Sequence, residues 1–61
     1  MPSDESRRLL KAFGVAVTDF EDAVHRNDSV EEIIKAEANV RARLEELTAL
    51  IERLRRNASA A

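Results

Sequence analysis

The spacing of the large apolar residues constrains the fold of this 61-residue chain more than any other feature of its sequence. Two lines recur at alternating spacings of three and four, which place their members on one face of an α-helix; a half-buried strand would need a spacing of two. The first line, here the first seam, is Leu10, Phe13, Val17, Phe20 and Val24. The second seam is Val30, Ile33, Glu37, Val40, Leu44, Leu47, Ile51 and Leu54. Both patterns predict amphipathic, heptad-patterned helices.

The two seams do not share a helical phase. Continued past Val24, the first seam would reach positions 27, 31 and 34, whereas the second seam begins at Val30. The slip of one residue is a rotation of about 100°. One straight helix therefore cannot present both seams to the same neighbour.

The residues between the seams are typical of one helix ending and another beginning. Asn27 tolerates the left-handed conformation of a helix end, and Ser29 followed by Glu32 fits a capping box. We therefore expect an all-α fold, a hairpin of two antiparallel helices in one domain. Its expected parts are a helix over residues 3–26, a turn at 27–29, a helix over 30–57 and a frayed tail at 58–61.

Two other local structures are compatible with the sequence. A single bent helix would need only that Asn27 and Asp28 be tolerated within it, which is easier than for Pro. A short strand at residues 13–18 is the other, because Gly14 and β-branched residues lower helix propensity there. Within a helix, Gly14 would either permit close helix approach or simply be tolerated.

The width of the apolar stripes predicts contacts beyond one hairpin. Folding about residue 28 would bring the two seams together. The pairs would run from Val24 with Ile33, near the turn, to Leu10 with Leu47. Ile51 and Leu54 would be left without partners. Further small or apolar residues flank the seams: Leu9, Ala16, Ile34 and Leu50. Helices with broad apolar faces touch two neighbours, as in a four-helix bundle, and a chain this short has little core of its own. We therefore expect a homo-oligomer, with a dimer favoured, or docking on a larger protein.

Glu37 is the one charged member of either seam. Three interpretations are open: it reaches solvent and pairs with Arg41, it forms a buried polar layer that specifies the assembly, or it is a ligand or acid–base group. We favour a role in assembly and treat Glu37 as a specificity element.

The side-chain inventory disfavours catalysis and metal binding. The chain has no Cys and one His, so it lacks a thiol nucleophile and cannot build a Cys- or His-rich metal centre. Glu21, His25 and Glu37 are the residues from which a metal site would have to be made, and the helical positions of Glu21 and His25 place them on a flank. We expect no enzyme activity, no metal and no cofactor.

Charge and hydropathy argue against nucleic-acid and membrane partners. The net charge is −2, and the chain has no Trp or Tyr on which bases could stack. A nucleic-acid-associated regulator is nevertheless the alternative function, and it would use arginines of the second helix: Arg41, Arg43, Arg53, Arg55 and Arg56. The longest non-polar run, residues 12–17, is too short for a bilayer span, and the acidic start does not fit a signal peptide. We expect a cytoplasmic protein.

Overall fold

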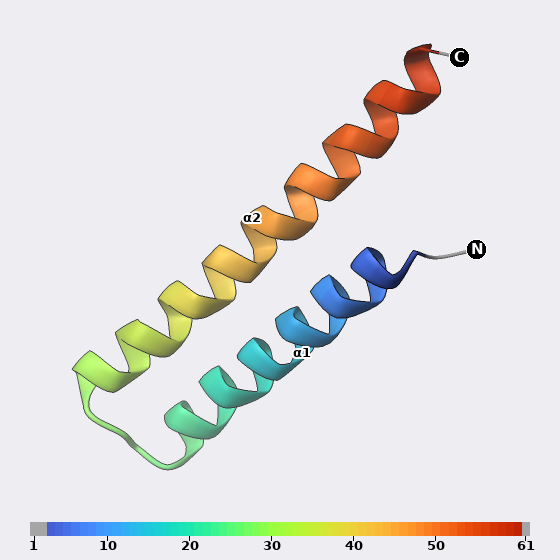
Figure 1. The fold of residues 1–61 in the computed structure, drawn as a ribbon. Helices are drawn as coiled ribbons and strands as arrows, with labels where there is room; N and C mark the ends of the chain where they lie inside the picture. The colour runs from blue at the N-terminus through green and yellow to red at the C-terminus, as the bar shows by residue number, and fades with distance from the viewer. Residues whose placement is uncertain (1–2, 61) are drawn as a thin grey trace.

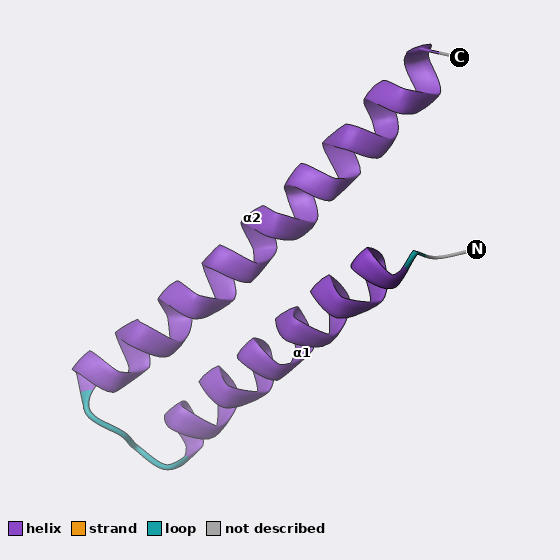
Figure 2. Cartoon of the chain, in the orientation of Figure 1, coloured by secondary structure: helices purple, strands orange, loops and turns teal. Residues whose placement is uncertain are grey.

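The computed structural model describes residues 3–60 and shows two antiparallel α-helices packed side by side (Figure 1). Helix α1 is Asp4–His25 and helix α2 is Val30–Ala60. No strand occurs among the described residues (Figure 2). The predicted all-helical hairpin is confirmed, and both the single bent helix and the short strand at residues 13–18 are wrong. The end of the expected tail, Ala61, lies outside the described residues.

The start of α1 is capped by Ser3. This residue is extended, and its Oγ accepts a hydrogen bond from the Ser6 backbone N–H at 3.1 Å. Asp4 and Glu5 follow in the first turn, where their negative charge complements the helix macrodipole.

The end of α1 is a Schellman motif. Asn27 has a φ of 59°, the left-handed conformation that turns the chain out of the helix. The Asn27 N–H donates to the Val24 carbonyl at 3.1 Å, and the Asp28 N–H donates to the Ala23 carbonyl at 3.0 Å. These two bonds satisfy carbonyl groups that a helix end would otherwise leave unpaired.

Helix α2 begins after Ser29, whose Oγ accepts from the Glu32 N–H at 3.2 Å. At its other end α2 extends to Ala60; the fraying expected from residue 58 stays a prediction. Alanine has the highest helix propensity of any residue, so the alanines near this end favour helix beyond residue 57. The longer α2 therefore runs past the start of α1 (Figure 1).

The two helices meet through small side chains. The fully buried residues are Ala16, Ala23 and Leu50, which are 1%, 4% and 8% exposed. Several residues that directly precede a seam position are buried or half-buried. We call these residues the contact lines. On α1 they are Leu9, Ala12, Ala16 and Ala23, and on α2 they are Ala36, Arg43 and Leu50.

This contact differs from the expected pairing of the two seams inside one hairpin. Leu10, Val17 and Val24 of the first seam are 58%, 40% and 43% exposed. The flanking alanines face α2 instead, because small side chains let the helix backbones approach closely. Leu10, Val17 and Val24 therefore turn about 100° away from the line of Leu9, Ala16 and Ala23. Other members of the two seams stay half-buried: Phe13, Phe20, Ile33, Val40 and Leu47.

Among the described residues, neither helix combines the length and the apolar composition that crossing a bilayer requires.

Candidate functional site

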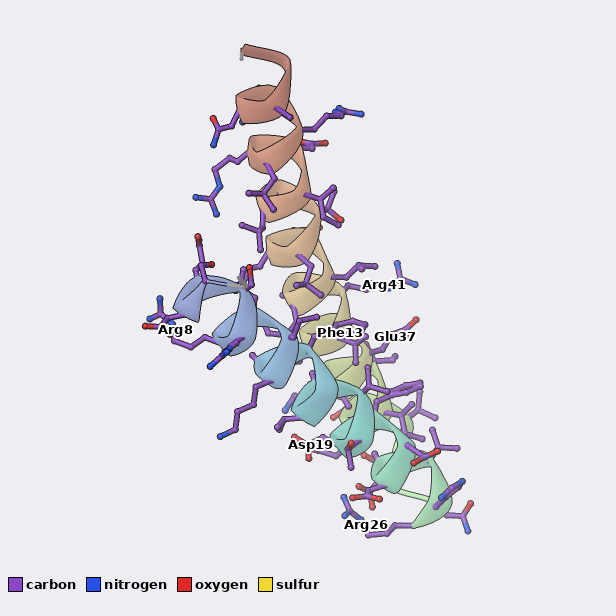
Figure 3. All side chains as sticks on the ribbon, turned by 90° about the vertical axis from the view of Figure 1, so that its right-hand side faces the viewer. Arg8, Phe13, Asp19, Arg26, Glu37 and Arg41 are labelled. Carbon is purple, nitrogen blue, oxygen red and sulfur yellow. The ribbon has the colours of Figure 1, made fainter. Side chains whose placement is uncertain are left out.

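Both seams lie on the same side of the hairpin. Each seam follows its contact line by one residue, a turn of about 100°. Viewed from the start of α1, this turn is clockwise on α1 and anticlockwise on α2, because α2 runs the opposite way. Since the contact lines face each other, both seams turn to one side, here called the apolar face. Figure 3 shows Phe13 and Glu37 on one side of the hairpin and Arg8 and Asp19 on the other.

Large side chains on the apolar face are strongly exposed. Its most exposed members and their exposed fractions are Leu10 58%, Val30 72%, Leu44 50%, Ile51 63% and Leu54 55%. Of the large apolar residues reported as strongly exposed in the described part of the chain, only Val15 and Ile34 lie elsewhere. Scattered apolar residues are normal on a protein surface, whereas these exposed residues share one side of the hairpin.

The opposite face of the hairpin is polar. Its exposed residues include Arg8, Lys11, Asp19, Asp22, Lys35, Asn39 and Glu46. The hairpin is thus amphipathic as a unit, with one polar side and one apolar side.

Glu37 lies within the apolar face and is paired there. The Arg41 Nη2 donates to Glu37 Oε2 at 2.9 Å, and the Glu37 side chain is 45% exposed. This geometry matches the first interpretation of Glu37, in which the carboxylate reaches solvent and pairs with Arg41. Its action as a specificity element stays a prediction.

Arg43 is the one charged residue on a contact line, and sequence reasoning did not place it there. Its Nε lies 3.0 Å from Glu46 Oε1, yet the N–H is not directed at that oxygen, and this buried Nε makes no hydrogen bond. The side chain lines a shallow depression between the helices together with Leu9 and Ala12. The aliphatic stem of arginine fills such an apolar gap while its terminus stays near water. The only sequence signal for this placement of Arg43 is that it directly precedes the seam residue Leu44.

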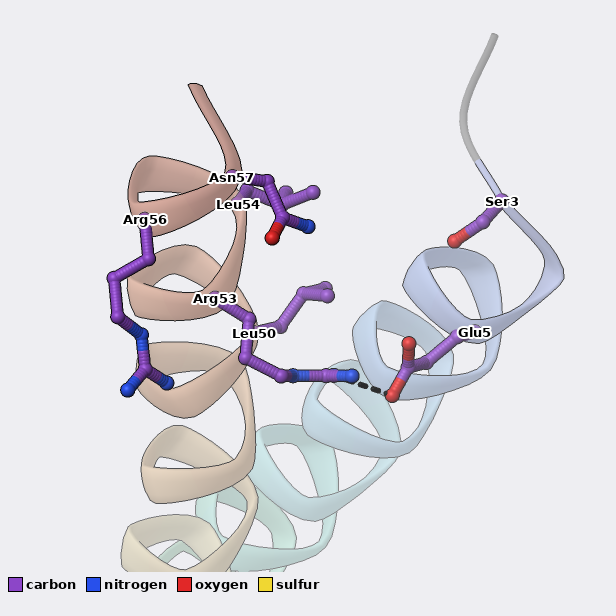
Figure 4. A pocket seen from close by; sticks show the side chains of 7 residues that line it. All are labelled: Ser3, Glu5, Leu50, Arg53, Leu54, Arg56 and Asn57. Atoms are coloured by element: carbon purple, nitrogen blue, oxygen red, sulfur yellow. Dashed lines mark hydrogen bonds and ion pairs between the residues drawn. The ribbon is translucent and has the colours of Figure 1, made fainter. Parts of the chain in front are cut away.

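A second depression lies at the open end of the hairpin, between the start of α1 and the last turns of α2 (Figure 4). Arg53 Nη2 donates to Glu5 Oε2 at 2.6 Å across this gap. Arg56 points away from α1 in the same view. Leu54 lines the depression but remains 55% exposed, so α1 does not cover it.

The arginines proposed for nucleic-acid contact are largely engaged with acidic side chains. Arg41, Arg43 and Arg53 lie beside Glu37, Glu46 and Glu5 respectively. Arg55 and Arg56 are exposed near the end of α2. These five residues therefore do not form a continuous basic surface that could follow a phosphate backbone.

The residues considered for a metal site are not brought together. Within residues 3–60, no group of three or more His, Asp or Glu side chains has a geometry that could hold a metal ion. His25 is the last residue of α1, where its charged form would complement the helix macrodipole.

One ion pair fixes the turn. Arg26 Nη2 donates to Asp28 Oδ2 at 2.9 Å. The hydrogen bond from Arg26 is the main cause of a lowered pKa of the Asp28 carboxyl; desolvation opposes this lowering and the charge of Arg26 adds to it. The same hydrogen bond and the charge of Asp28 raise the pKa of the Arg26 guanidinium.

Comparison with protein-family models, curated proteins and solved structures gives no match, so the functional argument depends on the geometry of the hairpin.

Proposed function

We propose that this chain is a non-enzymatic interaction module that self-associates through its apolar face, with two hairpins forming a four-helix bundle. The observation that carries the proposal is the position of both seams on one exposed face. In a bundle of two hairpins, each helix contacts its partner within the hairpin through a contact line and a helix of the second hairpin through its seam.

The energetics of a lone hairpin support this proposal. Only Ala16, Ala23 and Leu50 are fully buried among the described residues, and two of them contribute little apolar area. A large aliphatic side chain contributes about 1.5–3 kcal/mol when fully buried. Covering the exposed side chains of the apolar face would therefore add stabilisation to a hairpin that has few fully buried residues of its own.

The size of the apolar face fits a stable protein interface. The hairpin is 49 Å long and 18 Å wide between its Cα extremes, and its broad side carries the face. That area is on the order of the ~800 Å² per partner that a specific interface buries.

Two valines of α1 provide a matched test. Val17 is 40% exposed on the apolar face, and Val15 is 52% exposed on the polar side. Val17→Ser and Val15→Ser make the same chemical change two residues apart, with the same effect on helix propensity. We expect Val17→Ser to weaken self-association at least tenfold and Val15→Ser to leave it within about twofold, because burying a hydroxyl without a partner is costly.

Sedimentation equilibrium over a range of protein concentrations measures the association, and circular dichroism follows the helix content on dilution. Because dimer stability depends on protomer concentration, dilution should lower the melting temperature of the wild type. A helical monomer whose melting is independent of concentration would refute self-association, as would equal effects of the two serine variants.

A further inference from the structure

We infer that the two hairpins of the dimer are antiparallel, with their turns at opposite ends and a twofold axis at the level of Ala16 and Ala42. This inference depends on the proposed self-association and specifies its geometry. It follows from the register of the two seams, which a second copy of the chain complements in only one orientation.

The second seam is symmetric about residue 42. Its members fall into four pairs, each centred on that residue: Val30 with Leu54, Ile33 with Ile51, Glu37 with Leu47, and Val40 with Leu44. Two antiparallel copies of α2 that cross at residue 42 would therefore bring every member of the seam level with another member. Such self-complementarity is what a twofold interface requires, since the same patch is used on both subunits.

The first seam has the same centre. The ion pair between Glu5 and Arg53 sets the register of the hairpin. Counting eleven residues forward from Glu5 along α1, and eleven residues back from Arg53 along α2, brings Ala16 level with Ala42. To within about one residue, a twofold axis at this level would place Val17 beside its own copy and Phe13 level with Phe20 of the second hairpin. One axis thus aligns both seams at once.

The other orientation, with both turns at one end, covers the apolar face less completely. There α2 would lie against α1 of the second hairpin in the register of the Glu5–Arg53 pair. Ile51 and Leu54 would then lie level with positions 7 and 4, which are Arg7 and Asp4. These two strongly exposed apolar side chains, 63% and 55% exposed, would remain without apolar partners.

The charge within the apolar face does not oppose the antiparallel arrangement. Glu37 would lie level with Leu47 of the second copy, but its carboxylate is held 2.9 Å from Arg41. The pair carries no net charge, and both side chains keep access to solvent. An ion pair in this position can stay hydrated while the neighbouring apolar residues are covered.

Disulfide trapping tests the orientation directly, because the sequence contains no cysteine. Ile33→Cys and Ile51→Cys variants would be mixed, exchanged and oxidised in a glutathione buffer, and the products separated by mass. Antiparallel hairpins bring position 33 level with position 51 of the second copy. Position 51 of one hairpin is then about 27 Å along the axis from position 51 of the other hairpin, whereas a disulfide needs Cα atoms within about 7 Å. A mixture of Ile51→Cys with Ala49→Cys, which alters an exposed alanine on the polar side, measures random collision.

We expect at least tenfold more mixed disulfide from Ile33→Cys with Ile51→Cys than from the control mixture, and no excess Ile51→Cys homodimer. An Ile51→Cys homodimer as the main product would overturn the antiparallel arrangement while leaving self-association intact. A dimer by sedimentation that gives no mixed disulfide would overturn it also. Val30→Cys with Leu54→Cys repeats the test at a second level if the first pair lowers helix content. A monomer in sedimentation would instead refute the proposed function.

Discussion

Replacing Ala16 with leucine tests whether the alanine line of α1 is the surface that packs on α2. Ala16 is the most buried side chain of the described chain, at 1% exposure. Leucine adds three carbon atoms at a point where the two helix backbones lie close together. The added volume would force the helices apart or force the new side chain into a strained rotamer.

The size of the effect follows from this burial. Overpacking a well-packed position costs about 1–3 kcal/mol. A chain of this length draws only ~3–5 kcal/mol from a single core, so the loss is a large fraction of its stability. For a domain of about 60 residues, each 1 kcal/mol shifts the melting temperature by roughly 4–8 °C. We therefore expect Ala16→Leu to lower the melting temperature by at least about 4 °C.

Ala38→Leu is the matched control, because Ala38 is exposed on α2 and receives the same three carbon atoms. Surface substitutions of this kind change stability by less than about 0.5 kcal/mol. Thermal melting followed by circular dichroism, at one protomer concentration for all proteins, gives the comparison. Equal melting temperatures for Ala16→Leu and Ala38→Leu would refute packing through the alanine line.

Three further outcomes are expected. A Cβ added at Gly14 meets nothing within 4 Å, so Gly14→Ala should stabilise the helix by about 0.5–1 kcal/mol in thermal melts; destabilisation would place a close neighbour there. Glu37→Leu should raise the melting temperature and give a mixed mass in sedimentation, since a polar residue in a seam specifies assembly at a cost in stability; a lower melting temperature would point to a satisfied polar network. In an NMR titration, Arg26→Ala should raise the pKa of Asp28. Because the folded-state pKa of Asp28 is lowered, the ion pair's contribution to folding stability is present above the ordinary pKa range of Asp. It is lost as the pH falls through the lowered pKa. An unchanged titration of Asp28 in the variant would exclude Arg26 as the cause.

The secondary structure of this protein could be predicted from its amino-acid sequence, because the signals that specify it are local. The spacing of the seams specifies helix over both halves, and the slip in phase places the break between Val24 and Val30. Asn27 and Ser29 supply the chemistry of a helix end and a helix start, as the left-handed φ of 59° and the Ser29 cap show. Ionic and capping partners a few residues apart, such as Glu37 and Arg41, could likewise be predicted from helical geometry.

Which line of each helix faces the other could not be predicted from the sequence and is seen in the packed hairpin. Periodicity defines the lines along a helix, but adjacent lines differ by one residue, and each helix here has an apolar seam beside a line that can pack closely. The choice depends on both helices at once and on the rotation that the turn at residues 27–29 imposes. Packing through Ala16 and Ala23 lets the backbones approach and leaves both seams on one outer face. The candidate interface is therefore a consequence of how the two helices pack, since neither seam alone indicates whether it is covered within the chain or by a partner.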